Sequence, residues 1–160
     1  MTGRMLEKIE QILIDEVPDY VLIYGDTNST LAGALAAVKL HIPVVHVEAG
    51  LRSFNMKMPE EVNRILSDRI STLLLCPTGI AVENLRAENI TDGVHNIGDV
   101  MFDAVKFYGK IANPSEHIKT LVKSGYYLVT VHRAENTDNI ERLTNIMCAL
   151  DELAKFKNVI

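Results

Sequence analysis

The sequence lacks several features that would assign a protein quickly to a class. Only two cysteines, Cys76 and Cys148, occur in 160 residues, without metal-ligand or disulfide spacing. We therefore expect both to be reduced, buried thiols of a cytoplasmic protein. No apolar stretch reaches 18 residues and no signal-like segment opens the chain, so neither secretion nor membrane association is predicted.

Basic charge is also scarce. The 16 Lys and Arg residues are outnumbered by 21 Asp and Glu residues, which gives a formal net charge of −5. A general nucleic-acid binder needs a basic stripe to neutralise phosphates, so no nucleic-acid partner is expected. The sequence also contains neither the GxGxxG nor the GxxxxGK[ST] pattern, so a dinucleotide fingerprint and a P-loop are not supported.

The chain does contain a regular alternation of short apolar runs and helical patterns. The apolar runs predict buried parallel strands at residues 21–24, 43–47, 72–76, 94–97 and 126–131. Between them, apolar residues at helical spacing predict helices, including one from about Asn28 or Ser29, its expected cap, and a last one over about 137–154. Such alternation is typical of right-handed βαβ units. The predicted fold class is α/β, with a doubly wound parallel sheet.

Turn-forming residues mark one domain boundary. Gly109, Asn113 and Pro114 cluster between two helical patterns, which divides the chain into residues 1–112 and 113–160. The chain opens with a helix and closes where a strand begins, whereas a parallel sheet needs neighbouring strands. We therefore expect an interior piece of a longer protein, with the later part of one domain and the opening of a second.

Two acidic residues directly follow two of the predicted strands. Asp26 closes the first strand and Glu48 closes the second. In open α/β sheets, ligands bind beyond the carboxyl ends of the strands, so these two side chains should lie side by side in a ligand crevice. A poorly solvated carboxylate in such a place points either to chemistry or to an ionic partner.

Each acid has a structural alternative. The turn at residues 25–30 suits anion binding at a helix start, but it equally suits a simple N-cap in which Asp26 offsets the helix dipole. Glu48 suits a catalytic carboxylate whose pKa a second acid tunes, but a buried ion pair with Arg52 is equally open.

Two further segments offer charged groups. Glu60 and Arg64 share one face of a helix, either as a solvated pair or as contributors to the same crevice, with Arg64 binding a phosphate or a carboxylate. His132 and Arg133 lie at the end of another predicted strand, where they suit the binding of a diphosphate.

Four of these blocks, in this order, resemble the UDP-N-acetylglucosamine 2-epimerase family of the non-hydrolysing type. The blocks are Gly25-Asp26-Thr27, His46-Val47-Glu48-Ala49-Gly50-Leu51-Arg52, Pro59-Glu60-Glu61-x-Asn63-Arg64 and His132-Arg133-x-Glu135-Asn136. The resemblance covers essentially the whole chain. It implies a GT-B-type pair of Rossmann-like domains with the active site in the cleft between them. Residues 1–112 and 113–160 would then contribute to the first and second of these domains.

The resemblance also implies roles and partners. It implies catalytic roles for Asp26, Glu48, Glu60 and His132, and substrate contacts by Asp26, Glu48, Arg64, His132, Arg133 and Glu135. The implied activity is an isomerase that interconverts UDP-N-acetylglucosamine and UDP-N-acetylmannosamine by eliminating and re-adding UDP. The implied partners are a UDP-sugar and a second copy in a homodimer, with no cofactor and no metal.

Other interpretations stay open at this point. The segment at residues 51–59 is also similar to the subgroup that acts on UDP-2,3-diacetamido-2,3-dideoxyglucuronate. A hydrolysing 2-epimerase, a GT-B glycosyltransferase and a fragment without activity are the remaining alternatives, because fold analogy alone does not separate them.

Overall fold

The computed structural model describes residues 1–160, which divide by their internal contacts into two units. The first unit spans Met1–Phe107 and the second spans Tyr108–Ile160. None of the helices is long and apolar enough to cross a lipid bilayer.

The first unit is built on a four-stranded parallel sheet in the order β1-β2-β3-β4. Its strands are β1 (Val21–Tyr24), β2 (Val44–Val47), β3 (Leu73–Cys76) and β4 (Val94–Asn96). Their register is given by the pairs Val21–Val44, Val45–Leu73 and Leu74–Val94. The predicted parallel α/β architecture is confirmed.

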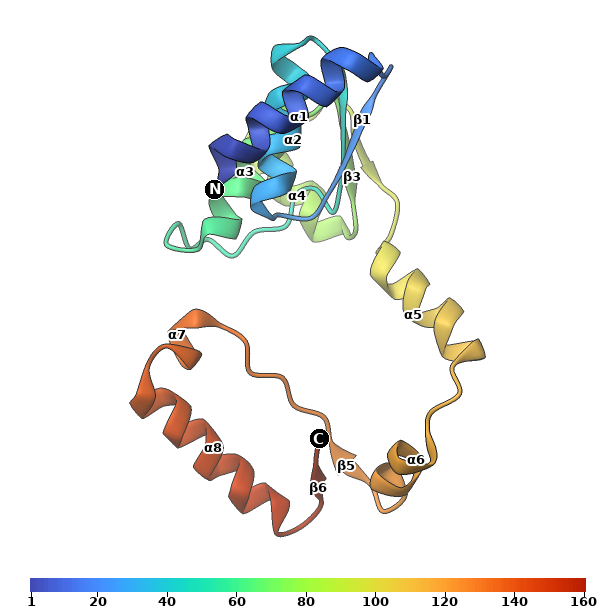
Figure 1. Ribbon diagram of the computed structural model, residues 1–160, viewed down its shortest axis with the longest axis vertical. Coiled ribbons are helices and arrows are strands. Elements are labelled where there is room, and N and C mark those ends of the chain that lie inside the picture. The colour runs from blue at the N-terminus through green and yellow to red at the C-terminus, as the bar shows by residue number, and fades with distance from the viewer. The chain divides into compact units, whose positions relative to one another are not determined.

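Helices connect the strands on one face of this sheet. The helices of the unit are α1 (Thr2–Glu16), α2 (Asn28–Lys39), α3 (Pro59–Ile70) and α4 (Gly79–Ala87), and α5 (Val100–Ile111) follows β4. The helices α2, α3 and α4 connect β1 to β2, β2 to β3 and β3 to β4, so each connection moves one strand along the sheet in the same direction. Because such connections are right-handed, the three helices lie on the same face of the sheet. Figure 1 shows this arrangement, with α1 beside α2.

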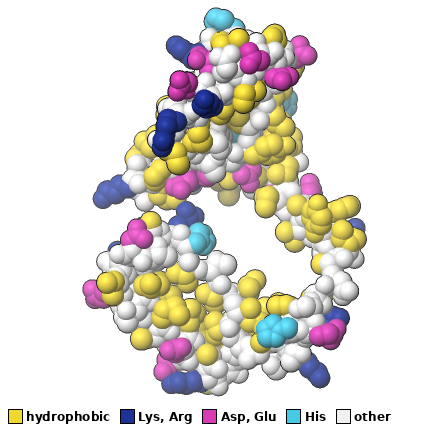
Figure 2. All heavy atoms as spheres, in the orientation of Figure 1, with side chains coloured by type: hydrophobic (Ala, Val, Ile, Leu, Met, Phe, Trp, Pro, Cys, Tyr) yellow, Lys and Arg dark blue, Asp and Glu magenta, His cyan; other side chains and the backbone are white.

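The core lies between these helices and the sheet. Small side chains on the buried face of α2, such as Ala34 and Ala37, let the helix approach the strands closely. The opposite face of β1 is less covered: Leu22 and Tyr24 are 51% and 60% exposed. Figure 2 shows hydrophobic side chains on the visible surface of both units.

The second unit contains short elements. They are α6 (Glu116–Val122), β5 (Tyr126–Tyr127), α7 (Ala134–Thr137), α8 (Ile140–Ala154) and β6 (Asn158–Val159). The strands β5 and β6 pair in parallel. The strand predicted at 126–131 is shorter in the structure, where β5 spans only Tyr126–Tyr127, although the Val129 N–H also donates to the Ile160 carbonyl at 2.8 Å. The helix predicted over 137–154 is also wrong at its start, because Asn139 caps a new helix there.

The two cysteines differ in burial. Cys76 is fully buried on β3, as expected, whereas Cys148 is exposed on α8. The prediction of a buried Cys148 is wrong, because α8 buries none of its residues within the described chain.

Candidate functional site

The turn after β1 is fixed by a reciprocal cap on α2. Thr27 is the N-cap: its hydroxyl accepts from the Thr30 backbone N–H at 3.4 Å, and the Thr30 hydroxyl accepts from the Thr27 backbone N–H at 3.2 Å. Thr30 also donates its hydroxyl to the carbonyl of Tyr24 at 2.6 Å. The predicted cap at Asn28 or Ser29 is therefore wrong, because only Thr27 makes this two-bond closure.

Asp26, just before the cap, contacts α3. Arg64 Nε lies 3.1 Å from Asp26 Oδ2, as a charge contact that is not aligned as a hydrogen bond. Asn63 Nδ2 donates to the Asp26 carbonyl at 2.8 Å. The second partner of Arg64 is Glu61, at 3.0 Å, so the predicted Glu60–Arg64 pair is wrong. Asp26 is thus held by α3 through both its side-chain carboxylate, which contacts Arg64, and its backbone carbonyl, which accepts from Asn63.

Glu48, at the end of β2, has a strained backbone. Its φ is +71°, in the left-handed region that side chains other than glycine rarely adopt. The backbone N–H groups of Glu48 and Ala49 both donate to the carbonyl of Leu75, at 3.1 and 3.2 Å. Such strain persists only where the surroundings over-determine it, and it clusters at functional sites.

The Glu48 carboxylate lies against the turn that carries Asp26. A Cβ added to Gly25 would come within 3.2 Å of Glu48 Oε2. Burial, the charge of Asp99 and the charge of Asp26 raise the pKa of Glu48, while His46 acts in the opposite direction. The two predicted acids are therefore brought together, as the strand-end argument expects.

Asp99 is a third acid at this edge of the sheet, and the sequence analysis missed it. It follows β4 and caps α5, where its Oδ1 accepts from the Met101 N–H at 2.8 Å. A signal was available, because Asp99 follows the end of β4 within three residues, much as Asp26 follows β1 and Glu48 follows β2. Its charge contributes to the raised pKa of Glu48.

Arg52 forms ion pairs with Asp68 and Glu88 rather than with Glu48. Its Nη1 donates to Asp68 Oδ2 at 2.7 Å, and its Nε and Nη2 donate to the Glu88 carboxylate at 2.6 and 2.8 Å. The Glu48–Arg52 pair is therefore wrong, because α3 and the end of α4 supply two other carboxylates. Burial alone would lower the pKa of Arg52, but hydrogen bonds to Glu88 and Asp68 raise it.

His46 and Asp68 form a buried pair beneath the strand ends. His46 Nδ1 lies 2.7 Å from Asp68 Oδ1, and His46 Nε2 lies 2.8 Å from the carbonyl oxygen of Gly25. Asp68 Oδ2 also accepts from the Gly50 N–H at 3.1 Å. No local spacing in the sequence links His46 to Asp68, because the two residues lie on different elements, β2 and α3.

The loop before α3 is held by Glu61. The Glu61 carboxylate accepts from the N–H groups of Ser53, at 2.9 Å, and Phe54, at 2.8 Å. Although burial alone raises the pKa of Glu61, these hydrogen bonds and the charge of Arg64 lower it overall. Glu61 therefore serves as an anchor for the loop.

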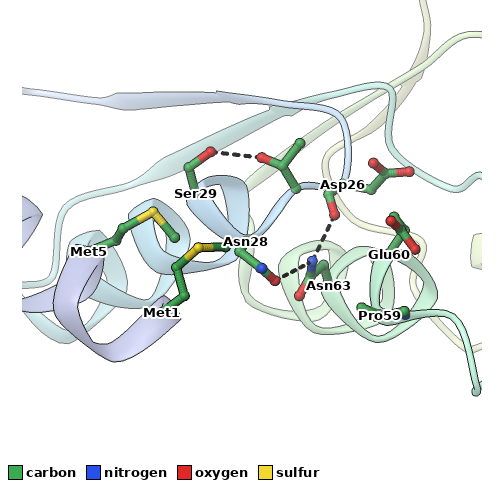
Figure 3. Close-up of a pocket in the computed structure, with 9 residues that line it drawn as sticks. Met1, Met5, Asp26, Asn28, Ser29, Pro59, Glu60 and Asn63 are labelled. Atoms are coloured by element: carbon green, nitrogen blue, oxygen red, sulfur yellow. Dashed lines mark hydrogen bonds between the residues drawn. The ribbon is translucent and has the colours of Figure 1, made fainter. Parts of the chain in front are cut away.

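A cavity of about 400 Å³ opens beside Asp26. Its lining comes from α1, the turn after β1 and the start of α3, and consists of Met1, Met5, Asp26, Thr27, Asn28, Ser29, Pro59, Glu60 and Asn63. Figure 3 shows the side chains of Asp26 and Glu60 near each other at one end, with Met1 and Met5 at the other. Glu48 and Arg64 do not line this cavity.

The remaining predicted site residues belong to the second unit. His132, Arg133 and Glu135 are exposed; Arg133 caps α7 and Glu135 lies in its first turn. Their convergence with Asp26 and Glu48 stays a prediction. Within residues 1–160, no three His, Cys, Asp or Glu side chains are grouped so as to hold a metal ion.

Comparison with known proteins places this site in a family context. A family model described as UDP-N-acetylglucosamine 2-epimerase matches residues 1–160. The UDP-2,3-diacetamido-2,3-dideoxy-D-glucuronate 2-epimerase of Pseudomonas aeruginosa is 54% identical over 156 residues, covering 96% of this chain and 44% of that protein. The UDP-N-acetylglucosamine 2-epimerase of Methanococcus maripaludis is 48% identical over 167 residues, covering 99% of this chain and 46% of that protein.

Solved structures agree with these relatives. The Methanocaldococcus jannaschii UDP-GlcNAc 2-epimerase in complex with UDP-GlcNAc and UDP matches with a TM-score of 0.88 and 48% identity, over 99% of this chain and 45% of that one. The Neisseria meningitidis UDP-GlcNAc 2-epimerase bound to UDP-GlcNAc matches with a TM-score of 0.85 and 34% identity, over 96% and 44%. The chain thus spans less than half the length of these relatives.

Proposed function

Because the chain belongs to the UDP-N-acetylglucosamine 2-epimerase family, we propose that the protein carrying it inverts C2 of a UDP-sugar, interconverting UDP-N-acetylglucosamine and UDP-N-acetylmannosamine. The observation that carries the proposal is the approach of the Glu48 carboxylate to the Asp26 turn, at the carboxyl ends of β1 and β2. Ligands of open α/β sheets bind at this edge.

The chemistry explains why acids are needed. C2 of the sugar has no carbonyl beside it, so its proton is not acidic and direct exchange would be very slow. In the proposed route a base removes the C2 proton, and the electron pair of the C2–H bond forms a C1–C2 double bond. The C1–O bond breaks, and UDP leaves with the electron pair of that bond. The product is a 2-acetamidoglucal with a C1–C2 double bond. UDP then adds back to C1, and an acid delivers a proton to the opposite face of C2.

The residues of the first unit suit the two proton transfers. A raised pKa allows Glu48 to exchange a proton nearer to neutral pH than an ordinary carboxyl group does. Asp26, beside the Arg64 guanidinium, and Glu60, at the cavity, are the other proposed acid–base groups. We propose that Asp26, Glu48 and Arg64 also contact the substrate.

Diphosphate binding is assigned to the second unit. His132, Arg133 and Glu135 lie around the start of α7 and are exposed, so they are open to a ligand. His132 and Arg133 would donate hydrogen bonds to the leaving UDP, which carries the developing negative charge. His132 is the member we propose to be catalytic.

A second substrate is favoured by a specific observation. The P. aeruginosa relative, which is 54% identical, is named for UDP-2,3-diacetamido-2,3-dideoxy-D-glucuronate. The M. maripaludis UDP-N-acetylglucosamine 2-epimerase is 48% identical. We therefore propose the diacetamido-glucuronate sugar as the alternative substrate for the same reaction.

The test is an incubation of the full-length protein with each UDP-sugar in heavy water. The proposal expects the C2 epimer to form and both epimers to carry deuterium at C2, because the proton is lost and regained through solvent-exchanging groups. Free N-acetylmannosamine and UDP would indicate a hydrolysing enzyme instead. Sugar transfer to an acceptor without C2 deuterium would indicate a GT-B glycosyltransferase, and no reaction with either sugar would contradict the proposal.

We further propose the following for the whole protein. It is a homodimer in the cytoplasm that uses no cofactor, and residues 1–112 and 113–160 belong to its two Rossmann-like domains. The 160-residue chain alone is inactive, which is supported by its coverage of less than half of the relatives' length. Sedimentation of the full-length protein and a turnover assay of the isolated chain test these points.

A further inference from the structure

Four charged side chains form a continuous row beneath the strand ends. In order they are His46, Asp68, Arg52 and Glu88, joined by contacts of 2.7, 2.7 and 2.6 Å. The first three side chains are at most 1% exposed and Glu88 is 29% exposed. Charges are buried only when they are paired and hydrogen-bonded, so this row is a built feature of the fold.

His46 and Asp68, at the buried end of this row, form hydrogen bonds with the turn that carries Asp26 and the turn that carries Glu48. His46 Nε2 contacts the carbonyl of Gly25, the residue before Asp26, at 2.8 Å. Asp68 Oδ2 accepts from the N–H of Gly50, two residues after Glu48, at 3.1 Å. One buried pair therefore links the two turns through backbone groups.

The hydrogen bonds define the charge of the His46 ring. A carbonyl oxygen only accepts, so the ring must donate from Nε2 to Gly25. Asp68 accepts from the Gly50 N–H and pairs with Arg52, which identifies it as a carboxylate. A carboxylate also only accepts, so Nδ1 must donate as well. His46 is then an imidazolium, and the row holds two cations and two anions.

We propose that His46, held as a buried imidazolium, and Asp68 are positioning residues that fix the Asp26 and Glu48 turns at the separation catalysis requires. The inference rests on the proposed function of those two acids. It explains how Glu48 keeps its left-handed backbone, because Gly50, which ends that turn, is tied to Asp68. Neither positioning residue needs to contact the sugar.

The first test compares variants of the full-length protein. In His46→Gln the amide donates from a single nitrogen, so it cannot reach both Gly25 and Asp68, and Asp68→Asn removes one of the acceptors. We expect each to lower kcat by about 10- to 100-fold, the cost of a misplaced catalytic group. KM should stay within about twofold, as for a loss confined to the transition state.

Glu88→Gln is the matched control. It weakens the outer ion pair of the same row but leaves the contacts among His46, Asp68 and Gly50 in place. We expect it to lower the melting temperature without changing kcat by more than about twofold. If His46→Gln and Asp68→Asn retain wild-type kcat, or if Glu88→Gln loses as much kcat as they do, the positioning role is wrong.

The pH profile separates positioning from simple loss of stability. Arg52 pairs with Asp68, the charge of Asp68 acts on Cys76, and the charge of His46 acts on Glu48, which Asp99 and Asp26 also influence. Because the His46 charge lowers the pKa of Glu48, its removal should move the Glu48 limb of the kcat profile to higher pH. Glu88→Gln should leave that limb in place, and an unmoved limb in His46→Gln contradicts the proposal.

The charge of the His46 ring can also be measured directly on the unmodified protein. Nitrogen-15 NMR of histidine-labelled full-length protein should show both ring nitrogens of His46 protonated near neutral pH. If either ring nitrogen of His46 lacks a proton, the proposed imidazolium is wrong, and this result does not depend on whether the variants fold. Absence of epimerisation by wild-type protein would instead refute the proposed function, and the NMR result would stand apart from it.

Discussion

Glu48 Oε2 lies over Gly25 so closely that a Cβ at position 25 would be only 3.2 Å away. Gly25 itself has a φ of +62°, which favours glycine. The first residue of the turn after β1 therefore lies against the acid at the end of β2, and the space between them suits a glycine at position 25.

Gly25→Ala should damage both folding and the proposed site. The left-handed backbone should cost about 1–2 kcal/mol of stability. The added methyl group should also displace the Glu48 carboxylate and reduce turnover by about 100-fold. Urea unfolding and a turnover assay measure the two effects. Gly109→Ala, in an exposed and open position of α5, should instead be neutral or stabilise by up to about 1 kcal/mol.

Glu48→Gln should make the protein more stable near neutral pH. The pKa of Glu48 is raised by burial, Asp99 and Asp26, so the folded state holds this proton more tightly than the unfolded state. The ionised acid is then a destabilising group, and stability falls as pH rises above the ordinary glutamate pKa of about 4.5. Melting curves should show the variant's advantage at pH 7 shrinking as pH falls toward that value. A less stable Glu48→Gln at pH 7 would contradict this assignment.

Glu61→Gln should behave in the opposite way. Burial opposes ionisation, but hydrogen bonds from Ser53 and Phe54 and the charge of Arg64 lower the pKa of Glu61 overall. Its stabilising effect is therefore present above the ordinary glutamate pKa of 4.5 and is lost as pH falls through the lower pKa of the folded state. The variant should be less stable at pH 7 by about 1–3 kcal/mol, because Arg64 loses the charge of Glu61 but keeps Asp26 as a partner. Equal stability at pH 7 would show that this anchor is dispensable.

Removal of the proposed catalytic groups should abolish most turnover in the full-length protein. Asp26→Asn, Glu48→Gln and His132→Ala should each lower kcat by at least about 100-fold, since each removes a proton-transfer or charge-stabilising group. Glu83→Gln and His117→Ala change exposed residues of the same types and serve as controls. Unimpaired turnover in all three test variants would refute the site.

The two cysteines should differ in reactivity. Burial raises the pKa of Cys76 to about 11, with a further contribution from Asp68, so its thiolate is scarce at neutral pH. Cys148 is exposed on α8. Iodoacetamide labelling followed by peptide mass spectrometry should modify Cys148 in the folded chain and Cys76 only after unfolding. Labelling of Cys76 first would contradict the described packing.

Local pattern was enough to predict the strands that carry the acids. Alternation of apolar runs and helical spacing depends on neighbouring residues, and each run of β1 to β4 was found within a residue or two. The positions of Asp26 and Glu48 followed, because parallel strands place their carboxyl ends at one edge. The same reasoning, applied to β4, would also have found Asp99.

Partner choice was decided only by the tertiary structure. Sequence spacing suggested Glu48 for Arg52 and Glu60 for Arg64, yet the folded chain brings Asp68 and Glu88 to the first arginine and Asp26 and Glu61 to the second. Long cationic side chains reach any acid that packing places nearby, and packing joins elements far apart in the chain. The sequence by itself therefore determined which acids stand at the strand ends, and the tertiary structure decided which charges hold them there.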